Sequence, residues 1–226
     1  MLASSKAVAH GDAGYHIGRM AQAKRHAYAA RHAHSDAQGD LFGSATALPA
    51  GFVYCNDVLS AAEEQTLAQS FAALPFKPFE FHGYLGKRRV VSFGWRYDYG
   101  DRTVHRSTPI PDFLQPVRTK AAAFAGLSVD RLEQVSVIEY APGAGIGWHR
   151  DKPEFDDVIA ISLLAPCTLR LRRPAGEGWD RARIAIAPRS AYLLRDPARQ
   201  QWYHSIPPLQ SLRYSITLRS MSTKTG

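Results

Sequence analysis

The sequence lacks long apolar runs and is poor in cysteine. No stretch approaches the roughly 20 apolar residues that a membrane-spanning helix needs, and the N-terminus has no apolar signal-peptide core. The only cysteines, Cys55 and Cys167, are too few for a disulfide framework and fit a reducing compartment. No heptad pattern is visible either. We therefore expect a cytoplasmic protein that does not contact membranes and is a monomer.

The sequence also has fewer acidic than basic residues. The 226 residues contain 20 Asp and Glu against 28 Lys and Arg, which gives a formal net charge of +8. A basic balance of this size attracts polyanions, usually nucleic acid or an anionic membrane surface, although charge that serves only solubility is the alternative. The length suits one domain, or one domain with an appendage.

Large aliphatic residues are nearly absent from residues 1–45, which are rich in Ala, His and Arg. Such a segment cannot bury enough apolar surface to offset its ordering entropy, so it predicts a flexible basic arm before a domain at 46–222. The histidines could bind metal, but their spacings match no defined site. Near the end of the arm, Gln38–Phe42 (QGDLF) resembles the short motif by which bacterial proteins dock on the replication sliding clamp. In the alternative interpretation, Leu41 and Phe42 simply pack on the core.

The first part of the domain has strong local signals. Residues 51–55 predict a strand, and Ser60 with Glu63 forms a capping-box signature for a helix that reaches Leu74. A second helix is expected at about 111–125. Between them, from Phe76 to Tyr99, aromatic and basic residues alternate. Interleaved rings and cations suit a surface that stacks bases and pairs with phosphates, although aromatics at strand spacing can instead be core.

The second part of the domain consists of short runs rich in β-branched and apolar residues, separated by Pro, Gly or Asp turns. The expected strands are 135–140, 158–164, 168–172, 183–186, 191–194 and 212–219. This pattern predicts an α+β protein that is mainly β, with a double-stranded β-helix (jelly-roll) core and N-terminal helices packed outside.

The first candidate metal ligands follow a Pro/Gly loop. His149 and Asp151 are two residues apart, so in an extended chain they point to the same side. With His204 downstream they supply the two histidines and one carboxylate of the non-haem Fe(II) facial triad. Arg213 and Arg219, six residues apart, share one face of the last strand. Because arginine is costly to bury, two on an inward face imply a buried anion such as a dicarboxylate.

Together with Tyr140-Ala-Pro-Gly, these positions resemble the AlkB family of 2-oxoglutarate- and Fe(II)-dependent dioxygenases over roughly residues 40–220. The resemblance implies that His149, Asp151 and His204 bind Fe(II). It also implies that Arg213 binds the distal carboxylate of 2-oxoglutarate, that Tyr140 hydrogen-bonds to this co-substrate, and that Arg219 acts near the metal.

The family's chemistry consumes O2 and 2-oxoglutarate, hydroxylates an N-alkyl group on a damaged base, and releases formaldehyde, succinate and CO2. The implied partner is alkylated DNA, possibly RNA, with the target base out of its stack. Gly86–Gly94 resembles the family's nucleotide-recognition strand, part of a lid over the site. The candidate nucleic-acid contacts are Lys87, Arg88, Arg89, Phe93, Trp95 and His82, where the rings could alternatively be core.

Three positions depart from the family pattern. Ile138 and Ser215 stand where asparagines are usual, which implies fewer hydrogen bonds to the co-substrate, and Pro153 replaces an acidic residue that contacts the base in some members. These departures leave open an oxygenase that acts on tRNA, a protein or a small molecule. A cupin-like protein without catalysis is a further alternative. Trp148, beside the metal histidine, is expected to point away from the metal into the core.

Overall fold

The computed structural model describes residues 47–81 and 84–222. It describes the side chains of all these residues except 81, 84 and 85. The basic arm, the clamp-like motif Gln38–Phe42 and the candidate contact His82 lie outside these described residues. Among the described residues, no helix has the length and apolar character needed to cross a membrane. Cys55 and Cys167 are both buried and unpaired with each other.

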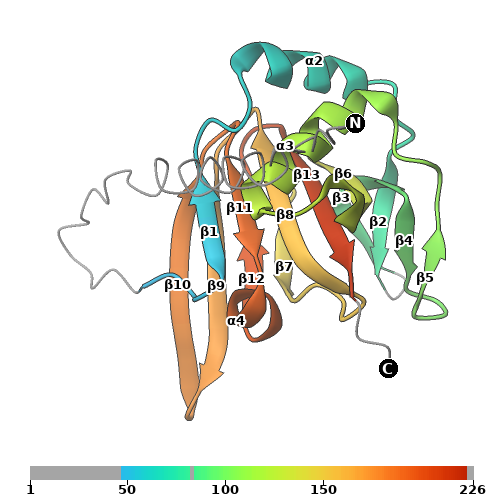
Figure 1. Cartoon of the computed structure of the whole chain (residues 1–226). Coiled ribbons are helices and arrows are strands. Elements are labelled where there is room, and N and C mark those ends of the chain that lie inside the picture. Colours follow the sequence, from blue (N-terminus) through green and yellow to red (C-terminus); the bar gives the residue numbers. More distant parts are fainter. Residues whose placement is uncertain (1–46, 82–83, 223–226) are drawn as a thin grey trace, which may run out of the picture. The chain divides into compact units, whose positions relative to one another are not determined.

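Two antiparallel sheets form the body of the domain (Figure 1). The larger sheet has the strand order β1-β11-β8-β13-β6-β3-β2, and the smaller has the order β10-β9-β12-β7. The strands of the larger sheet are β1 (Phe52–Cys55), β2 (Lys77–Phe81), β3 (Tyr84–Phe93), β6 (Leu132–Tyr140), β8 (Phe155–Leu163), β11 (Ala191–Leu194) and β13 (Arg213–Met221). Those of the smaller sheet are β7 (Ile146–His149), β9 (Cys167–Ala175), β10 (Gly178–Ile186) and β12 (Tyr203–Ile206). A separate hairpin joins β4 (Trp95–Asp98) to β5 (Thr103–Arg106). The mainly β, jelly-roll architecture expected from the sequence is confirmed.

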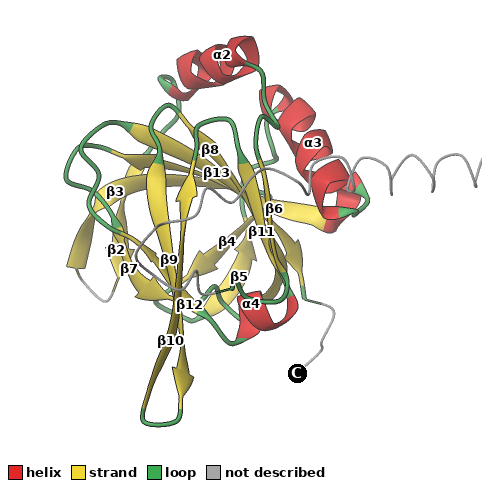
Figure 2. Cartoon of the chain, turned by 90° about the vertical axis from the view of Figure 1, so that its left-hand side faces the viewer, coloured by secondary structure: helices red, strands yellow, loops and turns green. Residues whose placement is uncertain are grey.

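Helices cover the outer face of the larger sheet (Figure 2). They are α2 (Ala61–Phe71) and α3 (Gln115–Ala125), the latter preceded by a 3-10 turn, η1 (Asp112–Leu114). Phe71 and Val117 pack from these helices into one core cluster with strand residues such as Ile161 and Ile216. Both expected helices are present, but α2 ends before Leu74. A second turn, η2 (Val129–Arg131), and a short helix, α4 (Asp196–Gln200), were not expected.

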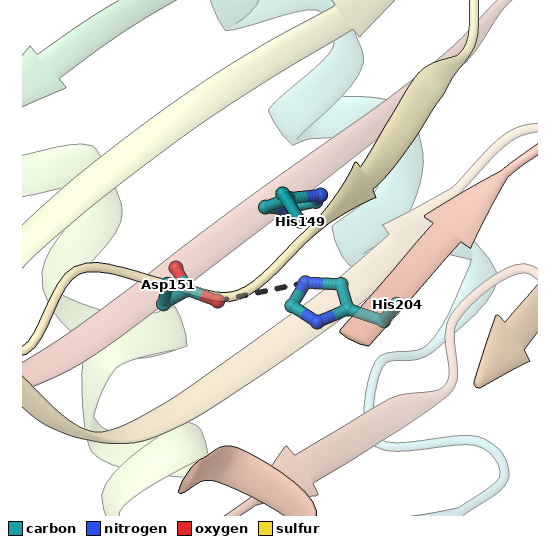
Figure 3. A group of neighbouring side chains, drawn as sticks. All are labelled: His149, Asp151 and His204. Carbon is teal, nitrogen blue, oxygen red and sulfur yellow. Dashed lines mark ion pairs between the residues drawn. The ribbon is translucent and has the colours of Figure 1, made fainter. Parts of the chain in front are cut away.

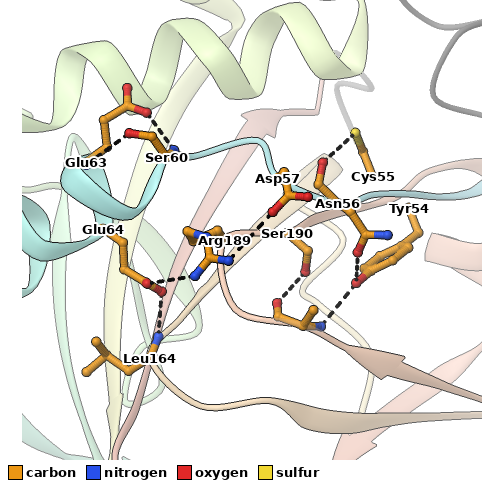
Figure 4. Close-up of polar contacts among 11 residues, drawn as sticks. Tyr54, Cys55, Asn56, Asp57, Ser60, Glu63, Glu64, Leu164, Arg189 and Ser190 are labelled. Carbon is orange, nitrogen blue, oxygen red and sulfur yellow. Dashed lines mark hydrogen bonds and ion pairs between the residues drawn. The ribbon is translucent and has the colours of Figure 1, made fainter.

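The capping box predicted at the start of α2 is complete (Figure 4). The backbone N–H of Glu63 donates to Ser60 Oγ at 3.2 Å, and the backbone N–H of Ser60 donates to Glu63 Oε2 at 2.8 Å. One residue on, Glu64 accepts from the backbone N–H of Leu164 at 2.8 Å and from Arg189 at 3.3 Å. The helix is therefore anchored to the turn that follows β8.

Strand alternation decides what faces the space between the sheets. In β6, Val135 and Val137 belong to the cluster under the helices, whereas Tyr140 belongs to a second cluster that includes residues of the smaller sheet. In β13, Ile216 and Leu218 take the helix side, so Arg213 and Arg219 take the opposite side. Arg213 lies opposite Tyr140 in the register, and Arg219 lies opposite Gln134. Polar groups far apart in sequence are thus brought to one face.

Candidate active site

The structure brings His149, Asp151 and His204 together in a candidate metal site (Figure 3). His149 ends β7 and is paired in register with His204 of β12, while Asp151 lies just beyond β7. One potential ligand atom from each residue lies within 4.8 Å of the others. The imidazole centroids are 4.1 Å apart, and Asp151 Oδ2 is 3.5 Å from His204 Nε2. Antiparallel pairing of two short strands therefore produces the cluster.

The protonation states of these residues suit a divalent metal. Burial lowers the pKa of His204 to about 3 and also lowers the pKa of His149, so both rings are neutral near pH 7. Burial acts to raise the pKa of Asp151, but the charges around it, of which Arg219 contributes most, together lower that pKa below its usual value, so the carboxylate stays ionised. Metal ligands must be deprotonated in this way. His149 Nδ1 lies 2.9 Å from the Gly147 carbonyl oxygen. A proton on Nδ1 leaves Nε2 free as the ligand atom.

Arg219 holds the carboxylate of Asp151 in place. Its Nε and Nη2 each lie 2.7 Å from Asp151 Oδ1, and its Nη1 donates to Gln134 Oε1 at 2.7 Å. Gln134 was missed from the sequence, because only the strand register places it opposite Arg219. Asp151 keeps Oδ2 on the side of His204.

Arg213 is the largest fully buried side chain among the described residues, with no exposed surface. Its Nε donates to Ser162 Oγ at 3.0 Å, and its guanidinium lies 5.1 Å from the ring centroid of Tyr140. Nη1 and Nη2 have no hydrogen-bond partner. A buried cation with unsatisfied donors is costly unless an anion joins it. Arg213 therefore fits the carboxylate of a dicarboxylic co-substrate. Ser162 was a further partner that the sequence did not reveal.

A cavity of about 1090 Å³ opens onto this site. Its wall includes His149, Asp151 and Arg219, together with the β6 stripe Gln134, Ser136 and Ile138. Tyr140 and Arg213 are not part of this wall, but they continue the inward-facing stripes of β6 and β13. The space is therefore large enough for a substrate group beside the triad.

Rings and cations form another part of the cavity wall. Phe79, Tyr97 and Tyr99 contribute the rings, and Arg88 and Lys152 contribute the cations. Arg88 Cζ lies 3.7 Å from the centroid of Phe79, and Lys152 Nζ lies 4.5 Å from Tyr97 and 5.0 Å from Tyr99. Arg88 thus faces the cavity, as expected of a substrate contact.

The other expected contacts on β3 and β4 are placed differently. Phe93 is 5% exposed and belongs to the core under the helices, so its interpretation as a base-stacking residue is wrong. Arg89 makes a two-fold ion pair with Glu139 at 2.7 and 2.8 Å and does not line the cavity. Lys87 and Trp95 are not on the cavity wall either. Alternation along β3 explains the split, because Arg88 faces the cavity while its odd-numbered neighbours face away.

The three departures from the family pattern also have clear positions. Ile138 and Ser215 are directly opposite each other in the β6–β13 register, and Ile138 lines the cavity. Pro153 is exposed and lies outside the cavity wall. The loop behind Asp151 is held by Arg199, whose Nη2 donates to the carbonyls of Lys152 and Phe155. Arg199 was not foreseen from the sequence.

Comparison with known proteins gives a consistent answer. The model of the 2OG-Fe(II) oxygenase superfamily matches residues 51–219. The chain is 30% identical, over 70% of its length, to a protein of Arabidopsis thaliana named alkylated DNA repair protein ALKBH8 homolog, and covers 51% of it. It is 27% identical, over 72% of its length, to the mouse protein named tRNA (carboxymethyluridine(34)-5-O)-methyltransferase ALKBH8, and covers 25% of it. The chain therefore spans about half or less of these relatives.

Solved structures show the same fold. The structure of OsALKBH1 superposes with a TM-score of 0.59 at 15% identity, covering 77% of this chain and 98% of that one. An oxidoreductase of the 2OG-Fe(II) oxygenase family from Burkholderia pseudomallei gives a TM-score of 0.53 at 14% identity, covering 76% of this chain and 85% of that one. With the matched superfamily, the ALKBH8 relatives and a His-Asp-His site in place, this chain belongs to the AlkB family of the 2OG-Fe(II) oxygenase superfamily and is a dioxygenase that uses Fe(II), 2-oxoglutarate and O2.

Proposed function

We propose that this dioxygenase removes an alkyl group from a base in nucleic acid, with alkylated DNA as the first substrate class. His149, Asp151 and His204 would hold Fe(II), which supplies the O2-dependent oxidation when it is bound. Neutral imidazoles and an ionised carboxylate favour this role. Arg219 keeps Asp151 oriented through contacts of 2.7 Å.

The co-substrate would be bound by Arg213 and Tyr140. The unpartnered Nη1 and Nη2 of Arg213 supply two donors for a carboxylate, in the planar geometry that arginine offers. Tyr140 is 3% exposed, and burial raises the pKa of its hydroxyl, so the hydroxyl stays protonated and can donate. The Ile138–Ser215 pair supplies fewer polar contacts than two asparagines, so co-substrate binding rests mainly on Arg213.

The observation that carries the nucleic-acid proposal is the group of rings and cations on the cavity wall. Phe79, Tyr97 and Tyr99 offer ring faces to a base that has left its stack, and Arg88 and Lys152 offer positive charge to the phosphates beside it. Among the lining residues, Glu80 and Asp151 are the only acidic side chains, and Asp151 is already bound to Arg219. The cavity therefore favours an anionic partner.

A second candidate is the same oxidation on tRNA. The names of the ALKBH8 relatives from mouse and Xenopus tropicalis refer to tRNA, although the chain covers only about a quarter of each. Pro153, in place of an acidic base contact, lies outside the cavity wall. A pocket without that contact has one fewer feature that selects a particular base, which leaves room for a base of tRNA.

Both candidates are tested by offering the full chain methylated DNA, methylated RNA and tRNA with Fe(II), 2-oxoglutarate and O2. Formaldehyde release and mass spectrometry of the base are the readouts. We expect turnover on DNA, and an oxidised tRNA base without turnover on DNA would favour the second candidate. Asp151→Ala should abolish succinate formation, whereas Asp130→Ala, an exposed carboxylate in the η2 turn, should not. Turnover on none of these substrates would refute the nucleic-acid proposal.

A further inference from the structure

The outward face of the smaller sheet gathers arginines and large rings. We name this surface the arginine–tryptophan face. It contains residues from all four strands and from the end of β7, namely Trp148, Arg150, Arg170, Arg172, Trp179, Arg181 and Tyr203. Trp148 was expected in the core, but it is half-buried and packs against arginines of this face.

Stacking holds these side chains in a fixed arrangement. The guanidinium of Arg172 lies between two indoles, with Cζ 4.3 Å from the Trp148 centroid and 4.2 Å from the Trp179 centroid. Arg170 lies 5.1 Å from Trp148, and Arg150 lies 4.7 Å from Tyr203. A guanidinium stacked on a ring keeps its N–H edge available for hydrogen bonds. The face therefore presents ordered donors rather than loose surface charge.

Several arginines of this face have no acidic partner among the described residues. No carboxylate pairs with Arg150, Arg170, Arg172 or Arg181 in the part of the chain that the structure describes. The Nε of Arg172 is buried without a hydrogen-bond partner. Arg173, by contrast, pairs with Asp180 at 2.9 Å. Alternation puts Arg173 and Asp180 on the other side of β9 and β10, so the carboxylate is on the wrong side to neutralise the face.

The arginine–tryptophan face is continuous with the cavity. Trp148 and Arg150 belong to both, because β7 is the edge strand of the smaller sheet and also borders the cavity. From β7 the face runs across β12 and β9 to Arg181 on β10. At about 4.8 Å between neighbouring strands, this is a track of about 14 Å. A strand whose base lies in the cavity can follow it.

We propose that the arginine–tryptophan face binds the sugar–phosphate backbone of a nucleic-acid strand that flanks the base in the cavity. This inference rests on the proposed action on nucleic acid and deepens it. The guanidinium edges contact phosphates, while Trp179, which is 41% exposed, offers a stacking surface to a flanking base. The contacts are to backbone, so they raise affinity for any sequence and steer the strand toward the cavity.

The test measures binding by fluorescence anisotropy, with the full chain and unmodified, labelled single strands of DNA and of RNA. Strands long enough to cross the face are compared with strands of a few nucleotides. Arg181→Glu reverses an exposed charge on the face, and Arg131→Glu reverses an exposed charge in the η2 turn as the matched control. We expect Arg181→Glu to weaken long-strand binding about tenfold or more and to lower the salt slope by about 1. Arg131→Glu should do neither, and short strands should bind both variants equally.

Trp179→Ala gives a second, charge-neutral test, and it should weaken long-strand binding by about 1–3 kcal/mol per stacked base, or roughly 5- to 150-fold. Equal effects of Arg181→Glu and Arg131→Glu would overturn the inference. A second result would also overturn it: the Arg181→Glu variant binds nucleic-acid strands as before but no longer binds phosphatidylserine vesicles. The partner of the face would then be a membrane. Because the strands are unmodified, the binding result does not depend on whether the protein dealkylates nucleic acid.

Discussion

At the scale of single residues, Arg213 is the clearest link between burial and function. Its guanidinium is fully buried, and its only hydrogen bond within the described residues goes to Ser162. Such a side chain lowers the stability of the free protein, and the cost is recovered only when an anion binds. The site is therefore arranged for a ligand rather than for stability.

This arrangement predicts opposite effects of Arg213→Met on stability and on binding. Without co-substrate, the free energy of unfolding should rise by about 1–3 kcal/mol, because an apolar side chain of similar length replaces an unpaired cation. Binding of 2-oxoglutarate should fall at least about 100-fold, since a buried charge-assisted contact is worth several kcal/mol. Urea unfolding and calorimetric titration measure the two quantities.

The matched control is Arg195→Met. Unlike the fully buried Arg213, Arg195 is partly buried, and it makes ion-pair contacts with Asp157 at 2.6 and 3.1 Å. Its loss leaves a carboxylate unpaired, so stability should fall by about 1–3 kcal/mol while 2-oxoglutarate affinity stays the same. A fall in stability in both variants would contradict the account of Arg213.

Spacing along one strand was enough to predict where some of the candidate site residues lie. His149 and Asp151, and likewise Arg213 and Arg219, are close in sequence, so period-two alternation places each pair. Gln134 and Ser162 could not be found, because they meet Arg219 and Arg213 only through the register of neighbouring strands. Phe93 was misjudged because its type fits both a stacking surface and a core.

At the scale of elements, the loop from Tyr140 to β7 helps to position β7 beside β12, the strands that carry the candidate metal ligands His149 and His204. Its backbone pairs with the segment after β12: Gly143 N–H donates to Leu209 O at 2.7 Å, and Leu209 N–H donates to Ala144 O at 2.9 Å. A Cβ added at Gly145 would lie 2.7 Å from the Ile206 carbonyl oxygen. The close approach needs glycine there.

Gly145→Ala should therefore move β7 relative to β12 and separate His149 from His204. We expect metal affinity to fall about 10- to 100-fold, as when a partner of a metal ligand is disturbed. Gly147→Ala is the control in the same loop-strand unit, because nothing lies within 4 Å of its added Cβ. Titration with Mn(II), followed by its paramagnetic resonance signal, measures both. Equal affinities for the two variants would be inconsistent with this role for Gly145.

The start of α2 predicts a pH effect on stability. The hydrogen bond from Lys120 and that from the Ser60 backbone lower the pKa of Glu63 from 4.5 to about 2. A carboxyl group whose folded pKa is lowered stabilises the fold above the unfolded pKa and loses that contribution as pH falls toward the folded pKa. The contribution of Glu63 is therefore complete at pH 6 and decreases between pH 4.5 and 2.

Glu63→Gln isolates this charge, since glutamine can still complete the capping box. Because Glu63 is 39% exposed, we expect a loss of only about 0.5 kcal/mol at pH 6. The gap between the two proteins should be smaller at pH 3. In a Lys120→Met background the substitution should have little effect at either pH. A gap that widens toward pH 3 in urea unfolding would show the assignment to be mistaken.

Elements with strong local signals were predicted, whereas several short ones were not. The helix at 61–71 has a capping box, and the strands β6, β8 and β13 contain runs rich in β-branched residues. The strand β12 and the helix α4 have 4 and 5 residues. Segments of this length depend on tertiary packing, which overrides the weak preference of a few residues.

At the scale of the whole molecule, the site joins the two sheets. The metal residues come from β7, β12 and the loop after β7, all at the smaller sheet, whereas Tyr140, Arg213 and Arg219 come from the larger sheet. The jelly-roll class could be predicted because its strands are regular and its motifs are spaced along the chain. The arginine–tryptophan face could not, because residues from β7, β9, β10 and β12 become neighbours only when the smaller sheet forms.

A site shared by two sheets predicts that its ligands stabilise the entire domain. Only the folded state assembles the triad and Arg213, so metal and co-substrate should raise the melting temperature. At 100 times each dissociation constant, a ligand contributes about 2.7 kcal/mol, which corresponds to about 5–10 °C for a chain of this size. Scanning calorimetry with Mn(II), then with Mn(II) and 2-oxoglutarate, should show two successive increases.

The variants separate the two increases. Asp151→Ala should lose both, because co-substrate binding follows the metal, whereas Arg213→Met should lose only the second. The histidines of residues 1–45 provide the competing explanation for any metal effect. If the metal binds to residues 1–45 rather than to the triad, Asp151→Ala should show the same rise in melting temperature as the unaltered chain. That result would show that the metal does not bind between the sheets. It would also leave a buried arginine with two unpartnered nitrogens unexplained.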